Sequence, residues 1–267
     1  AIAQEFDTPT SRISAYKRLC LTAAQQVAGG EPGFGILCDS RLGRSALYKA
    51  NGTGLWIGRP VEWPGSRPLK IEPELGEDFG GLNEWPLENV VKVLCYYHPS
   101  DDADLKLEQE STVKRLFTAA RRNNLEFLLE IIPSKVASTN EHTTAQVIDR
   151  FYDIGVYPDW WKLEPMKSSD AWHYAVDTIN TRDPYCRGIV VLGLEASPDD
   201  LSESFSLAAK FDLVKGFAVG RTIFAHAARS WLSGKMTDDE AVADMAERFA
   251  HLCRIWDNAR ARAGVAS

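Results

Sequence analysis

The chain has 267 residues, of which 45% are hydrophobic and 25% are charged, a balance typical of a globular protein and not of a disordered or fibrous one. Its formal net charge of -7 disfavours nucleic acid or an anionic membrane surface as its main partner. No apolar run approaches the roughly 18 residues of a membrane span, and the first residues lack a signal-peptide pattern, so we expect a soluble, cytoplasmic protein.

Short β-rich apolar runs alternate along the chain with longer segments of helical period, which predicts βαβ units and a parallel sheet. In chain order, the predicted strands cover residues 35–38, 54–61, 90–97, 126–132, 160–163, 188–194 and 215–219. The predicted helices cover residues 12–27, 104–123, 143–154, 169–180, 198–210 and 238–262. A stretch rich in proline and glycine, 60–86, is a predicted long loop after the second strand.

These elements predict an α/β fold, a TIM (β/α)8 barrel that occupies residues 1–267 as a single domain, since such barrels typically have about 250 residues. The predicted strands are one short of a closed barrel, and a polar segment and a helix come before the first of them. We therefore expect the missing first strand to precede residue 1, in a longer or untrimmed chain. An open, doubly wound sheet of seven strands is the alternative.

Charged side chains lie inside three successive predicted strands, at Lys92, Glu130 and Lys162. A charge in a buried strand costs several kcal/mol unless it is paired, and inward alternation would bring the three together in the barrel lumen. A lysine desolvated by Trp160 and Trp161 beside a second cation should have a lowered pKa and a nucleophilic amine. A nearby carboxyl can transfer the protons that imine formation needs. The pattern predicts Schiff-base chemistry, with a structural ion pair as the alternative.

Glycines end the last two predicted strands, at Gly193 and Gly220, and Arg221 follows the second glycine directly. The loops after the last two strands of a barrel often bind phosphate through backbone N–H groups, and arginine donates to phosphate as a fork. We expect a phosphate site here, although ordinary turns would explain the glycines equally well.

Four segments of the chain also carry a family resemblance: Gly-Ile-Leu-Cys-Asp at 35–39, Tyr-Tyr-His-Pro at 96–99, Pro-Asp-Trp-Trp-Lys-Leu-Glu-Pro at 158–165, and Gly-Phe-Ala-Val-Gly-Arg-Thr-Ile-Phe at 216–224. These segments carry the closer resemblance, over nearly the whole chain, to the aldolase-type domain fused behind the kinase of bacterial inositol breakdown, 5-dehydro-2-deoxygluconokinase. In order and rough spacing, the segments 91–97, 129–130, 161–165 and 220–222 also resemble the class I aldolases of the tagatose-bisphosphate and sulfofructose-phosphate aldolase group.

By this resemblance, Lys162 is the Schiff-base lysine, Glu130 a proton-transfer group and Lys92 an electrostatic partner. The resemblance also places Gly193, Gly220 and Arg221 in the phosphate site. The family has a first strand that ends in an aspartate-containing motif, and we expect that strand, too, to precede residue 1.

The resemblance further implies a substrate, 6-phospho-5-dehydro-2-deoxy-D-gluconate, cleaved to dihydroxyacetone phosphate and malonate semialdehyde. Because this aldehyde carries a carboxylate, we expect an arginine on the far side of the pocket from Arg221. Arg59 is the first candidate, and Arg41 and Arg44 are the next candidates. The alternative is that these arginines are surface cations with no role in binding. Asp39 completes the predicted substrate-binding residues.

Three further interpretations stay open: another class I aldolase specificity, for tagatose bisphosphate or sulfofructose phosphate; a non-catalytic sugar-phosphate-binding regulatory domain of a sugar kinase; and a barrel decarboxylase or isomerase whose lysine transfers a proton and forms no imine. No histidine pair has metal-ligand spacing and no CxxC motif occurs, so we expect no metal and no cofactor. The expected partners are the phosphorylated ketose, a sugar kinase domain fused ahead of residue 1, and a second copy of the chain bound through the apolar face of the last helix.

Overall fold

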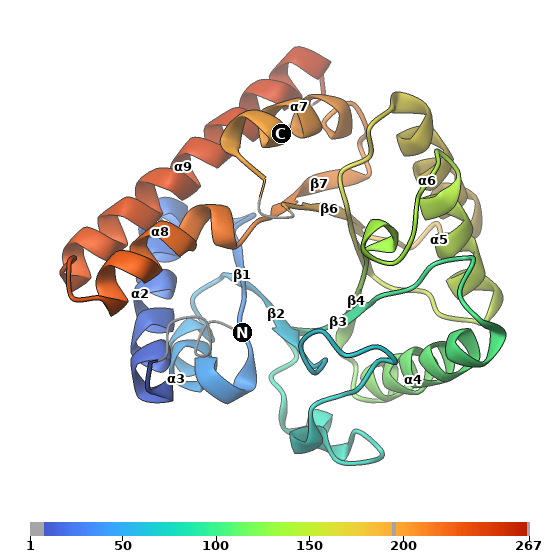
Figure 1. The fold of residues 1–267 in the computed structure, drawn as a ribbon, viewed down its shortest axis with the longest axis horizontal. Coiled ribbons are helices and arrows are strands. Elements are labelled where there is room, and N and C mark those ends of the chain that lie inside the picture. Colours follow the sequence, from blue (N-terminus) through green and yellow to red (C-terminus); the bar gives the residue numbers. More distant parts are fainter. Residues whose placement is uncertain (1–7, 194–195, 266–267) are drawn as a thin grey trace.

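A computed structural model of the protein describes residues 8–193 and 196–265. Seven strands form one sheet in which every strand pairs in parallel with the next along the chain. The strands are β1 (Gly35–Leu37), β2 (Trp56–Pro60), β3 (Asn89–Cys95), β4 (Glu126–Ile131), β5 (Trp160–Leu163), β6 (Gly188–Leu192) and β7 (Val214–Ala218). The sheet curls into a nearly closed barrel with the helices outside it (Figure 1). The predicted TIM-type barrel is therefore confirmed, and Leu194, at the predicted end of the sixth strand, lies outside the described residues.

The helices form the outer layer of the barrel. They are α2 (Thr10–Ala28), α3 (Ser40–Ala50), α4 (Ala103–Arg122), α5 (Thr143–Asp153), α6 (Ser169–Arg182), α7 (Pro198–Ala208), α8 (Arg221–Leu232) and α9 (Asp238–Ala263). None of the helices in the described part of the chain combines the length and apolar character that a membrane span requires. The predicted long loop is confirmed, with 3-10 turns at Pro73–Leu75 and Gly80–Glu84 and one antiparallel bridge between Glu62 and Ile71.

Two helices, α3 and α8, are absent from the sequence prediction. Helix α3 contains Gly43, and a glycine in a helix costs about 1 kcal/mol relative to alanine. The glycine is needed because a Cβ at this position would collide with the Cys38 sulfur. Helix α8 has Gly220 as its N-cap, so no capping side chain marks its start in the sequence.

Side chains fill the seam where the barrel is not closed by hydrogen bonds, between β1 and β7. Phe249 of α9 contacts Phe34, just before β1, with ring centroids 5.9 Å apart, and Phe217 of β7, with centroids 6.2 Å apart. Helix α2 packs against both α3 and α9, and the Tyr16 hydroxyl of α2 donates to the Phe224 carbonyl of α8 at 2.7 Å. The first described helix thus completes the outer layer beside the seam.

The structure bears on two expectations about the ends of the chain. Seven strands lie in the described residues, and Asp39 follows Cys38 directly after β1, while a further strand before residue 1 stays a prediction. The apolar face of α9 was expected in a dimer. Its buried side chains, including Met245, Leu252 and Trp256, lie within the chain, and α9 packs against α2, α7 and α8.

Because Phe249 contacts residues at both edges of the seam, we expect Phe249→Ala to lower the free energy of unfolding. A fully buried phenylalanine costs roughly 3–5 kcal/mol when truncated, and Phe249 is half-buried, so we expect a loss of about 2 kcal/mol. Urea denaturation of the wild type and the variant measures this change in the free energy of unfolding. Tyr185→Ala removes an aromatic ring that is 88% exposed and serves as the control. Equal destabilisation by both changes would contradict the role of Phe249 in the seam.

Candidate active site

The strand register turns three charged side chains into the barrel lumen. Glu130 of β4 is in register with Lys162 of β5 on one side and with Leu94 of β3 on the other. Residues in register share a face of the sheet, and side chains two apart in a strand share it too. Lys92, two residues before Leu94, therefore points to the same side as Glu130 and Lys162.

One carboxylate joins the two lysines. Glu130 Oε1 lies 2.8 Å from Lys162 Nζ, and Glu130 Oε2 lies 2.6 Å from Lys92 Nζ. The three side chains are buried, with exposed fractions of 6% for Lys92, 6% for Glu130 and 10% for Lys162. The structure thus brings together three residues that lie in successive strands far apart in the sequence.

A second carboxylate, Glu62, distinguishes the two lysines. Its Oε1 lies 2.5 Å from Lys92 Nζ, so Lys92 contacts two carboxylates and Lys162 contacts one. Glu62 Oε2 is buried and has no hydrogen-bond partner within residues 8–193 and 196–265. Glu62 was not predicted as a site residue, because it lies in the long loop after β2. Glu62 follows Gly58 and Pro60 at intervals of two residues, so it lies on the same face of the strand as they do. This alternation is the sequence signal that could have identified it.

This difference in contacts sets opposite pKa directions for the two amines. Burial alone would lower the pKa of Lys92, but attraction to Glu130 and Glu62 outweighs burial and raises it. For Lys162, burial is again the largest influence and lowers the pKa; Glu130 opposes this effect and Lys92 adds to it. Lys92 is therefore held as a cation, whereas Lys162 has the larger neutral, nucleophilic fraction.

The pKa of Glu130 is shifted as well. Burial would raise it, but the ammonium groups of Lys92 and Lys162 outweigh burial and lower it. Glu130 is therefore a carboxylate near neutral pH. It can accept a proton when Lys162 changes its charge during a reaction.

Arg59, the predicted carboxylate-binding arginine, lies on the opposite face of the sheet from the lysines. In the β2–β3 register Pro60 pairs with Lys92, whereas Arg59 pairs with Val91, whose side chain belongs to the outer core. Its guanidinium donates to Ser40 Oγ at 2.8 Å and to Asn89 Oδ1 at 3.2 Å, and it stacks on Trp85 at 3.6 Å. Arg59 was predicted to line the pocket opposite Arg221, but its side chain lies on the outer face of the sheet, because one residue along a strand exchanges the faces.

Asp39 has a structural task at the end of β1. Its Oδ1 accepts a hydrogen bond from the Leu42 N–H at 2.7 Å and caps α3, and its Oδ2 is paired with Lys17 of α2. Both side chains are about a quarter exposed. Asp39 thus fixes α2 and α3 at the carboxyl edge of the sheet, and no contact of Asp39 with Lys92, Glu130 or Lys162 is present among the described residues.

The predicted phosphate residues gather at the ends of β6 and β7. A Cβ on Gly193 would lie 2.9 Å from Val219, and a Cβ on Gly220 would lie 3.0 Å from Phe224, so a larger residue at either position would require the neighbouring side chain to shift. The hydroxyl of Thr222 donates to the Ala196 carbonyl at 2.9 Å and ties the start of α8 to the segment after β6. Arg221, exposed at the first position of α8, stands beside a helix N-terminus that has no side-chain cap. This geometry suits an anionic group.

The reactive groups in the barrel lumen are two amines and a carboxylate that they share. Within the described residues, no group of three or more His, Cys, Asp or Glu side chains is arranged as a metal site. The lumen offers a desolvated amine, a fixed cation and a shared carboxylate. This combination can form an imine with a ketone and transfer the protons that imine formation requires.

Comparisons with known proteins agree with this architecture. A family model described as "Uncharacterized protein conserved in bacteria (DUF2090)" matches residues 1–260. The fold is similar to that of fructose-bisphosphate aldolase from Plasmodium falciparum, solved in a ternary complex with TRAP and a small-molecule inhibitor. The TM-score is 0.64 at 15% sequence identity, over 100% of this chain and 88% of the aldolase chain. The likeness shows an aldolase-type barrel fold. No curated protein matches the chain.

The unequal lysines predict unequal reactivity. With formaldehyde and a mild hydride at pH 8, we expect Lys162 to be methylated faster than Lys92, because only neutral amines react and the pKa of Lys162 is lowered. Peptide mass spectrometry follows both sites. Glu62→Gln removes one carboxylate from Lys92 and should increase its labelling. Faster labelling of Lys92 than of Lys162 in the native protein would contradict the charge assignment.

Proposed function

Because the chain belongs to the bacterial family DUF2090 and has an aldolase-type barrel fold, we propose that it is a class I aldolase that forms a Schiff base between Lys162 and a phosphorylated ketose. The observation that carries this proposal is the buried pair of unequal lysines around one carboxylate. Among the described residues, Lys162 is paired with Glu130 alone, whereas Lys92 is paired with Glu130 and Glu62.

The proposed reaction begins with attack of the neutral Lys162 amine on the ketone carbon. The resulting carbinolamine loses water to give an iminium, and Glu130 exchanges the protons in this step. The iminium then withdraws electrons from the adjacent carbon–carbon bond, which breaks as the hydroxyl one carbon beyond it loses its proton and becomes an aldehyde. The enamine left on Lys162 gains a proton and is hydrolysed, which restores the amine.

Lys92 supports these steps as a fixed positive charge. It keeps Glu130 ionised and makes a second positive charge on Lys162 unfavourable before substrate binds. The iminium that forms later is positive, and its charge is balanced by Glu130, which contacts Lys162 at 2.8 Å. A low-dielectric site strengthens both effects.

For the substrate, we propose 6-phospho-5-dehydro-2-deoxy-D-gluconate, split into dihydroxyacetone phosphate and malonate semialdehyde. Support comes from the sequence motifs around Lys162 and Arg221 that resemble the kinase-fused aldolase domains. Arg59 faces away from the lumen and adds no support for a carboxylate end. A tagatose-bisphosphate or sulfofructose-phosphate specificity is therefore the alternative within the same mechanism.

The phosphate of the ketose is proposed to bind at Gly193, Gly220 and Arg221, where two strand ends and a helix N-terminus meet. By the same resemblance, we propose a sugar kinase, fused ahead of residue 1, as the source of the phosphate ester. We also propose that the protein forms a homo-oligomer. Its interface would not be the apolar face of α9, because that face packs within the chain.

The Schiff base is tested by trapping. Incubation with dihydroxyacetone phosphate and borohydride should give a reduced adduct on Lys162, detected by peptide mass spectrometry, and Lys162→Ala should abolish it. Lys215→Ala changes an exposed lysine of β7 and serves as the matched control, with the adduct expected unchanged. An adduct on Lys92 would exchange the roles of the two lysines. No adduct on either lysine would leave a non-catalytic sugar-phosphate-binding domain as the better account.

The phosphate end is tested by comparing two ketones. With dihydroxyacetone phosphate, Arg221→Ala should raise the concentration needed for half-maximal trapping about tenfold or more, since a charge-assisted hydrogen bond contributes roughly 1.5–3 kcal/mol. With unphosphorylated dihydroxyacetone, the same variant should behave like wild type. An equal effect on both ketones would show that Arg221 shapes the barrel and does not bind the phosphate.

A further inference from the structure

A tyrosine at the end of β3 belongs to the same lumen-facing row as the lysine of that strand. Tyr96 follows Lys92 and Leu94 at intervals of two residues, and it is half-buried, as Leu94 is. The next residue, Tyr97, is buried on the other face, where its hydroxyl donates to Glu110 at 2.5 Å. The two neighbouring tyrosines therefore face opposite sides of the barrel wall.

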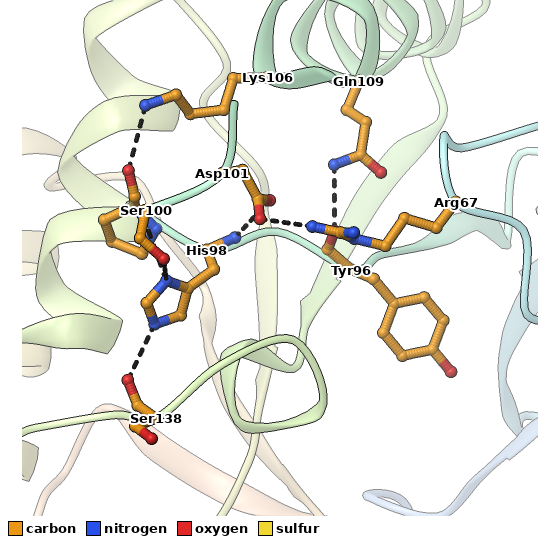
Figure 2. Close-up of polar contacts among 9 residues, drawn as sticks. Arg67, Tyr96, His98, Ser100, Asp101, Lys106, Gln109 and Ser138 are labelled. Carbon is orange, nitrogen blue, oxygen red and sulfur yellow. Dashed lines mark hydrogen bonds and ion pairs between the residues drawn. The ribbon is translucent and has the colours of Figure 1, made fainter. Parts of the chain in front are cut away.

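The backbone of Tyr96 is held by side chains from two other elements. Arg67, in the long loop after β2, donates through Nε to the Tyr96 carbonyl at 3.3 Å, and Gln109 of α4 donates to the same oxygen at 3.0 Å. Arg67 is also paired with Asp101, which accepts a hydrogen bond from the His98 N–H. Figure 2 shows these groups gathered around the Tyr96 carbonyl, with the phenol ring pointing away from them.

The hydroxyl at the end of this ring has no hydrogen-bond partner within the described parts of the chain. Burial raises the pKa of Tyr96, and Glu130 raises it further, with Lys92 among the opposing charges. Arg221, at the proposed phosphate end, also acts on the Tyr96 pKa. The phenol, on the lumen-facing row of β3, is thus a protonated donor.

The proposed aldolase reaction needs a proton donor that the lysine cluster does not supply. Glu130 is kept ionised by two ammonium groups, and Lys92 is kept protonated by two carboxylates. The free oxygen of Glu62 is buried from solvent. Glu130 is assigned to the protons of imine formation at Lys162, and Lys92 and Glu62 hold fixed charge, so we assign the proton exchanged with the cleaved hydroxyl to another side chain.

Resting on the proposed function, we propose that Tyr96 is a further catalytic residue, the acid–base group at the aldehyde oxygen. In the condensation direction, the enamine carbon on Lys162 forms a bond to the aldehyde carbon, and the carbonyl electron pair moves to its oxygen. That oxygen takes the proton of the Tyr96 hydroxyl. The tyrosinate regains a proton from water at the barrel mouth. Cleavage is the reverse: the tyrosinate removes the hydroxyl proton as the carbon–carbon bond breaks.

The test compares Tyr96→Phe with Tyr97→Phe, which removes the neighbouring hydroxyl on the outer face. Each variant and wild type are trapped with dihydroxyacetone phosphate and borohydride, which measures imine formation on Lys162. Each is then assayed for condensation of dihydroxyacetone phosphate with malonate semialdehyde or glyceraldehyde 3-phosphate, using the aldehyde that wild type accepts.

We expect Tyr96→Phe to form the trapped adduct as wild type does and to condense the aldehyde about 100-fold more slowly or worse, the usual range for loss of a general acid. Tyr97→Phe should match wild type in both assays. Condensation by Tyr96→Phe within a few-fold of wild type would overturn the proposal, as would a parallel loss of trapping. Absence of trapping in wild type would instead overturn the proposed aldolase function.

Discussion

The site depends on one buried carboxylate shared by two amines. A single ammonium beside Glu130 would form an ordinary ion pair, in which each partner favours the charged form of the other. With two amines at 2.6 and 2.8 Å, one carboxylate cannot neutralise both. Glu62 resolves the competition by adding a second negative charge beside Lys92. The lysine that lacks this second carboxylate, Lys162, is the one whose pKa is lowered.

This arrangement needs a parallel barrel with a defined register. Glu130 and Lys162 are direct neighbours across β4 and β5, and a shift of one residue in either strand would move a charge into the packed outer layer. The outer layer resists such a shift because the alternate residues of these strands, such as Leu129 and Trp161, are fully buried against the helices. Packing on the outside of the barrel thus determines the chemistry on its inside.

Much of this site could be predicted from the sequence, because a charge inside an apolar run is conspicuous. Lys92, Glu130 and Lys162 each interrupt a buried strand, and the parallel topology places them at neighbouring positions. Glu62 gave no such signal, since its position depends on a loop held by a bridge to Ile71. Arg59 was misplaced because composition locates a strand well but does not reveal which of two adjacent residues faces inward. Helix α3 was missed for a related reason, as Gly43 serves a close contact and weakens the helical pattern.

The seam between β1 and β7 gives the barrel a mechanical property that a fully hydrogen-bonded ring lacks. Where strands are joined by backbone hydrogen bonds, a change in circumference must break several directional bonds at once. At the seam, the Phe249 ring contacts both Phe34 and Phe217, and such dispersion contacts are individually weak and non-directional. The strands that carry the lysines lie away from this line in the strand order. A change in circumference is therefore least costly at this seam, away from the strands that carry Lys92, Glu130 and Lys162.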